Sequence, residues 1–146
     1  MTKIRLTKQF DFEAAHALEG YHGKCKDIHG HTYHLEVTVT GDIVHASTDV
    51  KDSMVIDFND LKKIVKENII DNFDHQLILY HKSKFAGLVK ENERTMLVKY
   101  IPTCENILID IVHRLKGVLP GHLMLYRVFL RETPRSFAEW YQEDNA

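Results

Sequence analysis

The stretch IRLTKQFDFEAAH, residues 4–16, decides the fold, because polar and apolar side chains alternate along it. Its later apolar positions share one parity and end in a histidine: Phe10, Phe12, Ala14 and His16. An alternation with a period of two predicts a β-strand with one buried face. His16 therefore ends the buried face of this strand.

A second alternating run, HTYHLEVTVT at residues 31–40, follows the polar, glycine-containing loop LEGYHGKCKD, residues 18–27. His29 and His31 have the parity of the run's apolar side chains, whereas His34 has the opposite parity. Two strands joined by such a loop are predicted to pair in antiparallel fashion. That pairing would bring the histidine that ends the first strand opposite the His29–His31 pair.

The hydrophobic period changes to three and four residues in two later segments, which predicts amphipathic helices. The first runs from about Phe58 to Ile69 and begins after Asp57, a suitable N-cap residue. The second lies in IPTCENILIDIVHRL, residues 101–115, with Thr103 as the expected N-cap.

Two more strands are predicted at residues 122–133, which are apolar on both sides, and at residues 136–141. The order strand, strand, helix, helix, strand, strand is typical of an α+β domain. We predict one domain, 1–146, with a four-stranded antiparallel sheet and two helices on one face. The segment His81–Lys99 is charged and shows no clear period. An uncovered apolar sheet face would favour oligomerisation.

The composition is that of a soluble globular protein, with 44% hydrophobic and 27% charged residues. The 19 basic and 21 acidic residues give a net charge of −2, and the basic ones are spread along the chain. This balance argues against a nucleic-acid partner. No segment is typical of a signal peptide or of a membrane span, so we expect a cytoplasmic protein without a membrane partner.

Three histidines form a candidate zinc site. Side chains two apart in a strand project on one side, with Cα atoms roughly 6.5–7 Å apart, so His29 and His31 can reach one ion. His16 would be the third ligand, and an open fourth position is typical of catalytic zinc. With ten histidines in the chain, a chance His-x-His pair is the alternative. The parity of His16 matches that of His29 and His31, which favours a metal site. His34 has the opposite parity, which excludes it as a ligand.

The two cysteines, Cys25 and Cys104, lie in different contexts. Cys25 lies in a polar loop between two lysines, where a thiolate would be favoured. It could be a fourth zinc ligand that closes a structural site, or a base beside the metal, and its spacing does not separate the two. Cys104 is a rival reactive thiol, although a small residue at a helix start is the simpler interpretation.

Two further groups could carry chemistry. Asp74 and His75 are adjacent, which suits a carboxylate that orients an imidazole for proton transfer, although such pairs are common in loops. Glu132 ends an otherwise apolar strand. It is either a solvated charge or, at a pocket floor, an acceptor for two parallel N–H groups of a flat heterocycle.

Six motifs follow one another along the chain: FEAAHAL, CKDIHGHTY, VIDFNDLK, FDHQL, PTCENI and LRETPRSFAEW. They occur in the same order in the family of 6-pyruvoyltetrahydropterin and 6-carboxytetrahydropterin synthases, which the chain resembles from about Phe10 to Trp140. The resemblance implies the tunnelling fold. In that fold the sheets of three subunits close a barrel, two trimers stack as a homohexamer, and the active sites lie between subunits.

The resemblance also implies roles for the candidate residues, in a lyase that uses Zn²⁺. His16, His29 and His31 match the metal ligands, Cys25 the catalytic thiol, Asp74 and His75 the proton-transfer pair, and Glu132 the residue that anchors the pterin. Thr103 and Glu105, in the family's PTxEN segment, match positions that line the substrate pocket. Cys25 and His75 would then meet from different chains.

Three residues separate Cys25 from His29, which resembles the 6-carboxytetrahydropterin branch of queuosine and deazapurine biosynthesis. The expected reaction converts 7,8-dihydroneopterin triphosphate to 6-carboxy-5,6,7,8-tetrahydropterin, with release of triphosphate and acetaldehyde. One alternative is 6-pyruvoyltetrahydropterin synthase, which eliminates triphosphate without C–C cleavage. The other alternative is a non-enzymatic zinc-binding module, in which Cys25 would be the fourth ligand and complete the coordination shell.

Overall fold

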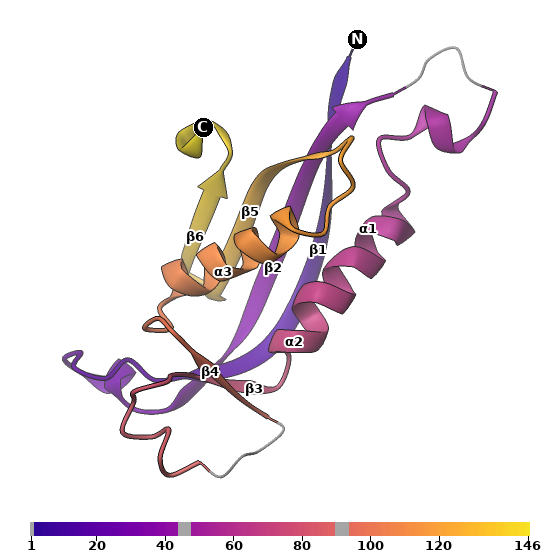
Figure 1. Cartoon of the computed structure of the whole chain (residues 1–146). Coiled ribbons are helices and arrows are strands. Elements are labelled where there is room, and N and C mark those ends of the chain that lie inside the picture. Colours follow the sequence, from indigo (N-terminus) through magenta and orange to yellow (C-terminus); the bar gives the residue numbers. More distant parts are fainter. Residues whose placement is uncertain (1, 44–47, 90–93) are drawn as a thin grey trace.

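A computed structural model describes residues 2–43, 48–89 and 94–146 of the chain. Six strands form one sheet in the order β4-β3-β1-β2-β5-β6 (Figure 1). The strands are β1 (Lys3–His16), β2 (His29–Asp42), β3 (Gln76–Tyr80), β4 (Thr95–Val98), β5 (Met124–Thr133) and β6 (Ser136–Tyr141). The helices are α1 (Phe58–Val65), α2 (Asp71–Phe73) and α3 (Cys104–Lys116), and a π-helical segment, Lys66–Ile70, joins α1 to α2.

The predicted pairing of the first two strands is confirmed. Strands β1 and β2 are antiparallel along their whole length, from Lys3 opposite Asp42 to His16 opposite His29. The buried apolar side chains of both strands lie on the face that the helices cover. Phe12 stacks on Tyr33 across the pair, with ring centroids 5.1 Å apart, which ties this register to the core.

The prediction of a four-stranded antiparallel sheet is wrong, because the sheet has six strands and is mixed. The four predicted strands are present as the antiparallel set β1-β2-β5-β6. Strand β3 adds to the edge of β1 in parallel, and β4 adds in parallel to β3. Strand β4 lies in the segment His81–Lys99, whose residues 90–93 are outside the described part of the chain. Both added strands are too short for an alternation to be read from the sequence.

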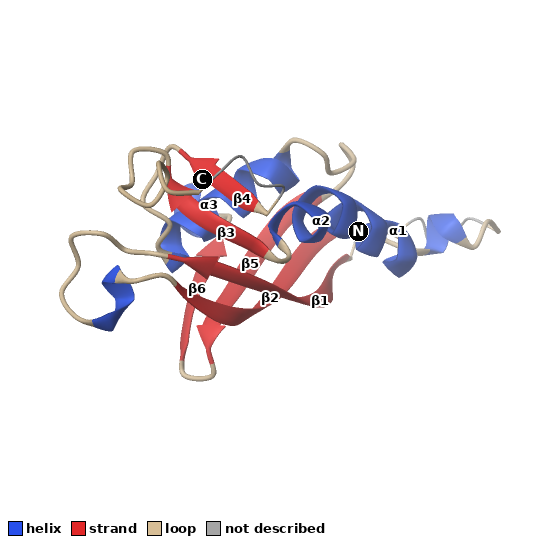
Figure 2. Cartoon of the chain, turned by 90° about the horizontal axis from the view of Figure 1, so that it is seen from below, coloured by secondary structure: helices blue, strands red, loops and turns tan. Residues whose placement is uncertain are grey.

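The helices pack on one face of the sheet, as predicted (Figure 2). Both predicted N-caps are confirmed: Asp57 accepts a hydrogen bond from the backbone N–H of Asn59, and Thr103 accepts one from that of Asn106. The core contains side chains from both helices and both long strands, among them Leu35, Val37, Leu61, Val65, Ile107 and Ile111, all fully buried.

The opposite face of the sheet carries a network of charged side chains beside the aromatic rings of Phe129 and Phe137, so the uncovered face considered for oligomerisation is not simply apolar. His34 lies there between two carboxylates, 2.8 Å from Asp11 and 3.1 Å from Glu36. Arg127 on β5 donates to Glu36 over 3.0 Å and to Glu139 on β6 over 2.7 Å. In the described part of the chain, no helix is long and apolar enough to cross a membrane.

Two isoleucines on α3 offer a matched test of this packing. Ile107→Ala should lower the free energy of unfolding by about 2–5 kcal/mol, because it leaves a cavity in a fully buried site. Ile109 is 45% exposed, and Ile109→Ala should change it by only about 0.5 kcal/mol. Urea unfolding of the two variants measures the difference, and equal effects would contradict the described orientation of α3.

Candidate active site

Three histidines converge where β1 ends and β2 begins. The side chains of His16, His29 and His31 each offer a ring nitrogen, and these nitrogens all lie within 4.8 Å of one another. The ring centroids are 4.5 to 5.1 Å apart. The strand register produces this arrangement, because it places His16 opposite His29 and Ala14 opposite His31. We call these three residues the histidine trio.

Backbone carbonyls determine which nitrogens of the trio point inward. The Nδ1 atom of His16 lies 2.6 Å from the Pro102 carbonyl oxygen, and that of His29 lies 2.8 Å from the Asp27 carbonyl oxygen. A carbonyl only accepts, so each Nδ1 carries the proton and each Nε2 keeps its lone pair. This is the tautomer in which an imidazole binds a metal through Nε2.

Burial favours the neutral form of two histidines of the trio, His16 and His31. Burial lowers the pKa of His16 below its usual value, and the neighbouring histidines add to the effect, although the Pro102 carbonyl and Glu132 oppose it. Burial also lowers the pKa of His31. Neutral imidazoles are the form that coordinates a metal.

The residues fit a zinc ion. Among the described residues, the Nε2 atoms of His16 and His31 have no hydrogen-bond partner although they are buried. A buried nitrogen without a partner costs free energy, and a metal ion would satisfy it. Three imidazole nitrogens are a donor set that Zn²⁺ favours.

Glu132 at the end of β5 also reaches the trio. Its Oε1 atom lies 3.4 Å from Nε2 of His16 and 3.7 Å from Nε2 of His31. The Tyr33 hydroxyl donates to the same oxygen over 3.5 Å. Burial, with Glu132 nearby, raises the pKa of Tyr33 well above its usual range, so this hydroxyl stays protonated. The alternative in which Glu132 is a solvated charge does not agree with this position.

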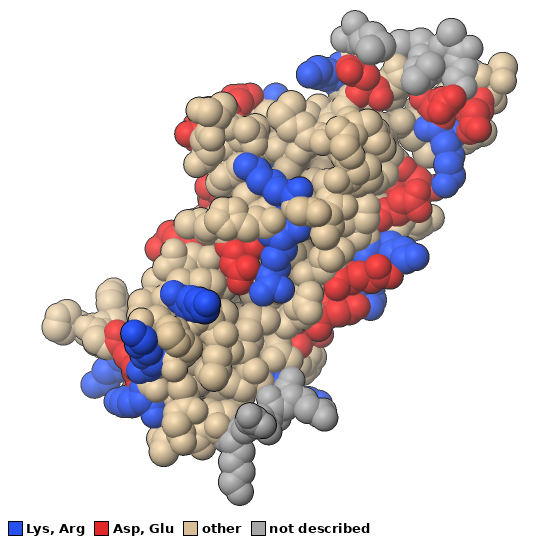
Figure 3. All heavy atoms as spheres, viewed as in Figure 1, with Lys and Arg blue, Asp and Glu red and all other residues tan. Residues whose placement is uncertain are grey.

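The catalytic candidate Cys25 lies apart from the trio's ligand atoms. It is exposed, in a short 3₁₀ turn, Lys24–Lys26, and its carbonyl accepts from the backbone N–H of Leu18. Among the described residues, the group that could hold a metal ion consists of the three histidines and does not include the Cys25 thiol. Basic side chains gather at the lower left of Figure 3, at the end of the molecule that carries this β1–β2 loop.

Asp74 and His75 form a pair, with Nδ1 of His75 3.0 Å from Oδ2 of Asp74. Partial burial opposes ionisation of Asp74, but hydrogen bonds from the Glu13 N–H and from His75 hold the pKa of the carboxyl below its usual range. His75 has a φ of 62°, a left-handed conformation that is uncommon for a residue with a side chain. Such residues concentrate at functional sites.

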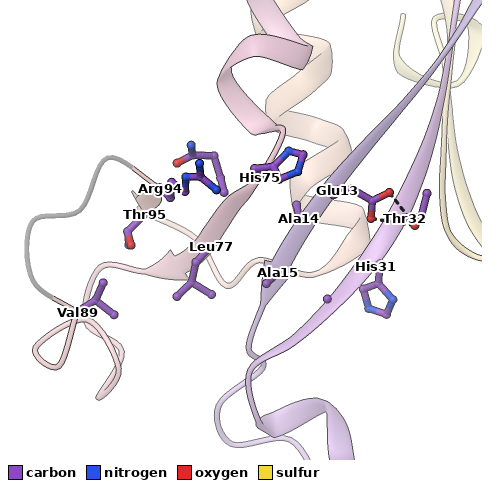
Figure 4. Close-up of a pocket in the computed structure, with 12 residues that line it drawn as sticks. Glu13, Ala14, Ala15, His31, Thr32, His75, Leu77, Val89, Arg94 and Thr95 are labelled. Atoms are coloured by element: carbon purple, nitrogen blue, oxygen red, sulfur yellow. Dashed lines mark hydrogen bonds between the residues drawn. The ribbon is translucent and has the colours of Figure 1, made fainter.

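His75 lines a cavity of about 520 Å³ whose other lining residues come from β1, β2, β3, β4 and the segment before β4. Figure 4 shows His75 and Arg94 on one side of it and Glu13 and Thr32 on the other. The Thr32 hydroxyl donates to the Glu13 carboxylate over 2.9 Å. Of the trio, His31 lines this cavity, whereas His16 and His29 do not. The trio and the Asp74–His75 pair are thus two clusters that are connected within the chain through His31, which lines the same cavity as His75.

The two substrate-binding candidates lie at the start of α3. The Thr103 hydroxyl caps the helix, and Glu105 is exposed in its first turn. Between them, the rival thiol Cys104 is buried, which raises its pKa to about 12, with Glu132 adding to the effect. Its Sγ atom donates to the Leu130 carbonyl. Cys104 is therefore a core residue, as the simpler interpretation predicted.

Two parts of the site were missed from the sequence. Tyr33 shares the parity of His31, and this signal could have identified it as a neighbour of the metal site. The Pro102 carbonyl comes from a segment 86 residues away from His16, and no sequence pattern indicates it.

Comparisons with known proteins cover nearly the whole chain. Residues 5–143 match the family model described as 6-pyruvoyl tetrahydropterin synthase. A Haemophilus influenzae protein named 6-carboxy-5,6,7,8-tetrahydropterin synthase is 42% identical over 145 residues, which cover 96% of this chain and 99% of the relative. A Rickettsia typhi protein of the same name is 36% identical, with 93% and 99% covered. The solved 6-pyruvoyl tetrahydropterin synthase of Caenorhabditis elegans has a TM-score of 0.69 at 26% identity, with 97% and 96% covered.

Two histidines on opposite faces of β2 test the metal site. His31→Ala should weaken zinc binding by more than about 100-fold, because loss of an outer-shell partner alone costs 10–100-fold. His34→Ala should leave zinc affinity unchanged, since His34 contacts Asp11 and Glu36 on the other face. Competition with a chromophoric chelator measures both affinities, and equal losses would contradict the assignment by parity.

The metal-free protein should lose stability as the pH falls. In the unfolded chain the trio's histidines titrate near pH 6.5, whereas burial lowers the folded-state pKa values of His16 and His31. Below about pH 6.5 the unfolded chain therefore binds more protons, so the free energy of unfolding decreases from there down to the folded-state pKa values. Urea unfolding between pH 7.5 and 5 measures this free energy, and His16→Gln should make its dependence on pH shallower. An equally steep slope in that variant would contradict the assignment.

Proposed function

Because the chain belongs to the 6-pyruvoyl tetrahydropterin synthase family, as its motifs predicted, we propose that it makes 6-carboxy-5,6,7,8-tetrahydropterin. The substrate would be 7,8-dihydroneopterin triphosphate, and the other products would be triphosphate and acetaldehyde. The observation that carries the proposal is the trio, whose ring nitrogens lie within 4.8 Å of one another and, among the described residues, form a group without a fourth histidine or a thiol. Such a site leaves a position open for a substrate.

The metal would be held by Nε2 of His16, His29 and His31. Zn²⁺ bound there would act as a Lewis acid on the hydroxyl groups of the substrate's side chain and lower the cost of removing a neighbouring proton. The Pro102 and Asp27 carbonyls keep two of these imidazoles in the required tautomer.

The proton-transfer groups would be Cys25 and the Asp74–His75 pair. Cys25 lies in the loop whose two ends carry His16 and His29, so it can approach a substrate held at the trio. Asp74, ionised and hydrogen-bonded to His75, would orient that imidazole and stabilise its charged form. His75 would then deliver or remove protons at the carbon next to the one that Cys25 deprotonates.

We propose that these clusters meet between subunits of a homohexamer built as a dimer of trimers. Within the chain, Cys25 is exposed and His75 faces a cavity that His16 and His29 do not line. A second chain would supply the missing partner of each cluster. The closed barrel of three sheets would bring the edge strands β4 and β6 of neighbouring chains together.

The pterin ring would be held by Glu132 with the start of α3. Two oxygens of a carboxylate match the two parallel N–H groups of a pterin ring. Glu105 is exposed beside it in the first turn of α3, and Thr103 would fix the backbone there by capping the helix. Lys24 and Lys26 lie in the loop that would face the triphosphate.

Two alternatives remain to be separated from this proposal. Formation of 6-pyruvoyltetrahydropterin would use the same site, but the three-residue gap before His29 and the Haemophilus influenzae relative favour the carboxy product and a role in queuosine-type biosynthesis. A non-enzymatic module would need Cys25 as the fourth ligand, and the exposed thiol lies outside the metal group.

The direct test combines the zinc-loaded protein with 7,8-dihydroneopterin triphosphate. Mass spectrometry should detect 6-carboxytetrahydropterin, and acetaldehyde should appear in equal amount. Cys25→Ala should reduce kcat by about 10²–10⁴-fold while zinc stoichiometry stays unchanged, because it removes a proton-transfer group and no metal ligand.

Cys104→Ala is the matched control, since it removes a buried thiol outside the proposed machinery and should retain turnover. A pyruvoyl product without acetaldehyde would establish the first alternative. Full turnover by Cys25→Ala would rule out the role proposed for this thiol.

A further inference from the structure

The carboxylate of Glu132 lies against two buried nitrogens of the trio, and at least the His16 nitrogen should repel it. The Nδ1–H group of His16 donates a hydrogen bond to the Pro102 carbonyl, so its Nε2 atom carries a lone pair. This Nε2 atom lies 3.4 Å from Oε1 of Glu132. His31 Nε2 lies 3.7 Å from the same oxygen. Neither nitrogen has a hydrogen-bond partner among the described residues. A carboxylate facing lone pairs is unfavourable unless a cation lies between them.

The distances match those between ligands of one ion. Zinc bonds of about 2.0–2.2 Å at tetrahedral angles separate neighbouring ligand atoms by roughly 3.3–3.5 Å. The 3.4 Å separation falls in this range, and 3.7 Å corresponds to a slightly wider angle. A carboxylate oxygen is also among the ligand types that Zn²⁺ accepts beside histidine.

The fold presents Glu132 at this place. The residue continues the buried side of β5 after Val128 and Leu130, and the pairing of β5 with β6 shifts register between Arg131 and Thr133. Such a bulge re-aims a side chain, and bulges are frequent beside active sites. Tyr33, fully buried and stacked on Phe12, donates to the same carboxylate oxygen over 3.5 Å and helps to hold it in place.

We propose that Glu132 is the fourth ligand of the metal in the substrate-free protein, and that it leaves the metal when it takes up the pterin ring. The inference rests on the proposed function, which assigns Glu132 to the ring. Each carboxylate oxygen has two acceptor sites, and one site of Oε1 is already used by the Tyr33 hydroxyl. A bond from Oε1 to the metal fills the second site, so Glu132 can accept two parallel N–H bonds through both oxygens only after Oε1 leaves the ion. The coordination position for the substrate's hydroxyls therefore opens only after the ring is in place, and until then Glu132 keeps water off the ion.

Zinc affinity tests the first half of the inference without any turnover. Glu132→Gln keeps the shape of the side chain but removes the charged ligand, and it should weaken zinc binding at least 10-fold in chelator competition. Glu139→Gln is the matched control on the neighbouring strand, because its carboxylate bonds to Arg127, and it should keep the affinity of the unmodified protein. Equal affinity of Glu132→Gln and the unmodified protein would overturn the inference.

The second half is tested on the unmodified chain, so it does not depend on the folding of a variant. The protein is loaded with Co²⁺ and titrated with 6-methylpterin, a ring without hydroxyls or phosphates that could reach the metal. The visible absorption of the cobalt should change as the ring binds, because the carboxylate leaves the ion. Ring binding without a spectral change would overturn the inference. A chain that binds neither zinc nor the ring would contradict the proposed function itself.

Discussion

The site depends on the register of the β1–β2 pair. Because side chains alternate across a strand, a slip of one residue would turn His29 and His31 to the polar face and separate them from His16. The stacked pair Phe12 and Tyr33 resists this slip, since both rings are buried beneath the helices. The same packing that forms the core thus aligns the three ring nitrogens that could hold a metal ion.

Helix α3 supports the site from a distance. Its N-cap, Thr103, fixes the backbone next to Pro102, whose carbonyl accepts a hydrogen bond from Nδ1–H of His16. Asp110 on the same helix accepts hydrogen bonds from Tyr100, over 2.6 Å, and from Arg114, over 2.8 Å. The Arg114 guanidinium lies 5.0 Å from the ring centre of Phe73, directly before the Asp74–His75 pair. One helix therefore braces both the candidate metal ligand His16 and the Asp74–His75 pair.

Much of this arrangement could be predicted from the sequence, and the exceptions have physical reasons. The long strands and both N-caps follow from local patterns, and parity alone separated His34 from the trio. Strands β3 and β4 could not be found in this way, because a short parallel strand at a sheet edge is defined by its neighbours. The charged network on the outer face was missed for a related reason: Asp11, Glu36 and Arg127 come together only when three strands pair.

The buried nitrogens of the trio are the exception to an apolar core at this end of the hairpin. His16 is 1% exposed, and its Nε2 atom has no hydrogen-bond partner among the described residues. A buried polar group left unsatisfied costs about 1–3 kcal/mol, which an apolar residue such as Ala14, two positions earlier on the same face, avoids. Binding an ion through Nε2 would recover that cost, so metal binding and hairpin stability are coupled. We expect a core of this size to fold the chain without the ion, and such independence would distinguish a catalytic site from a structural one.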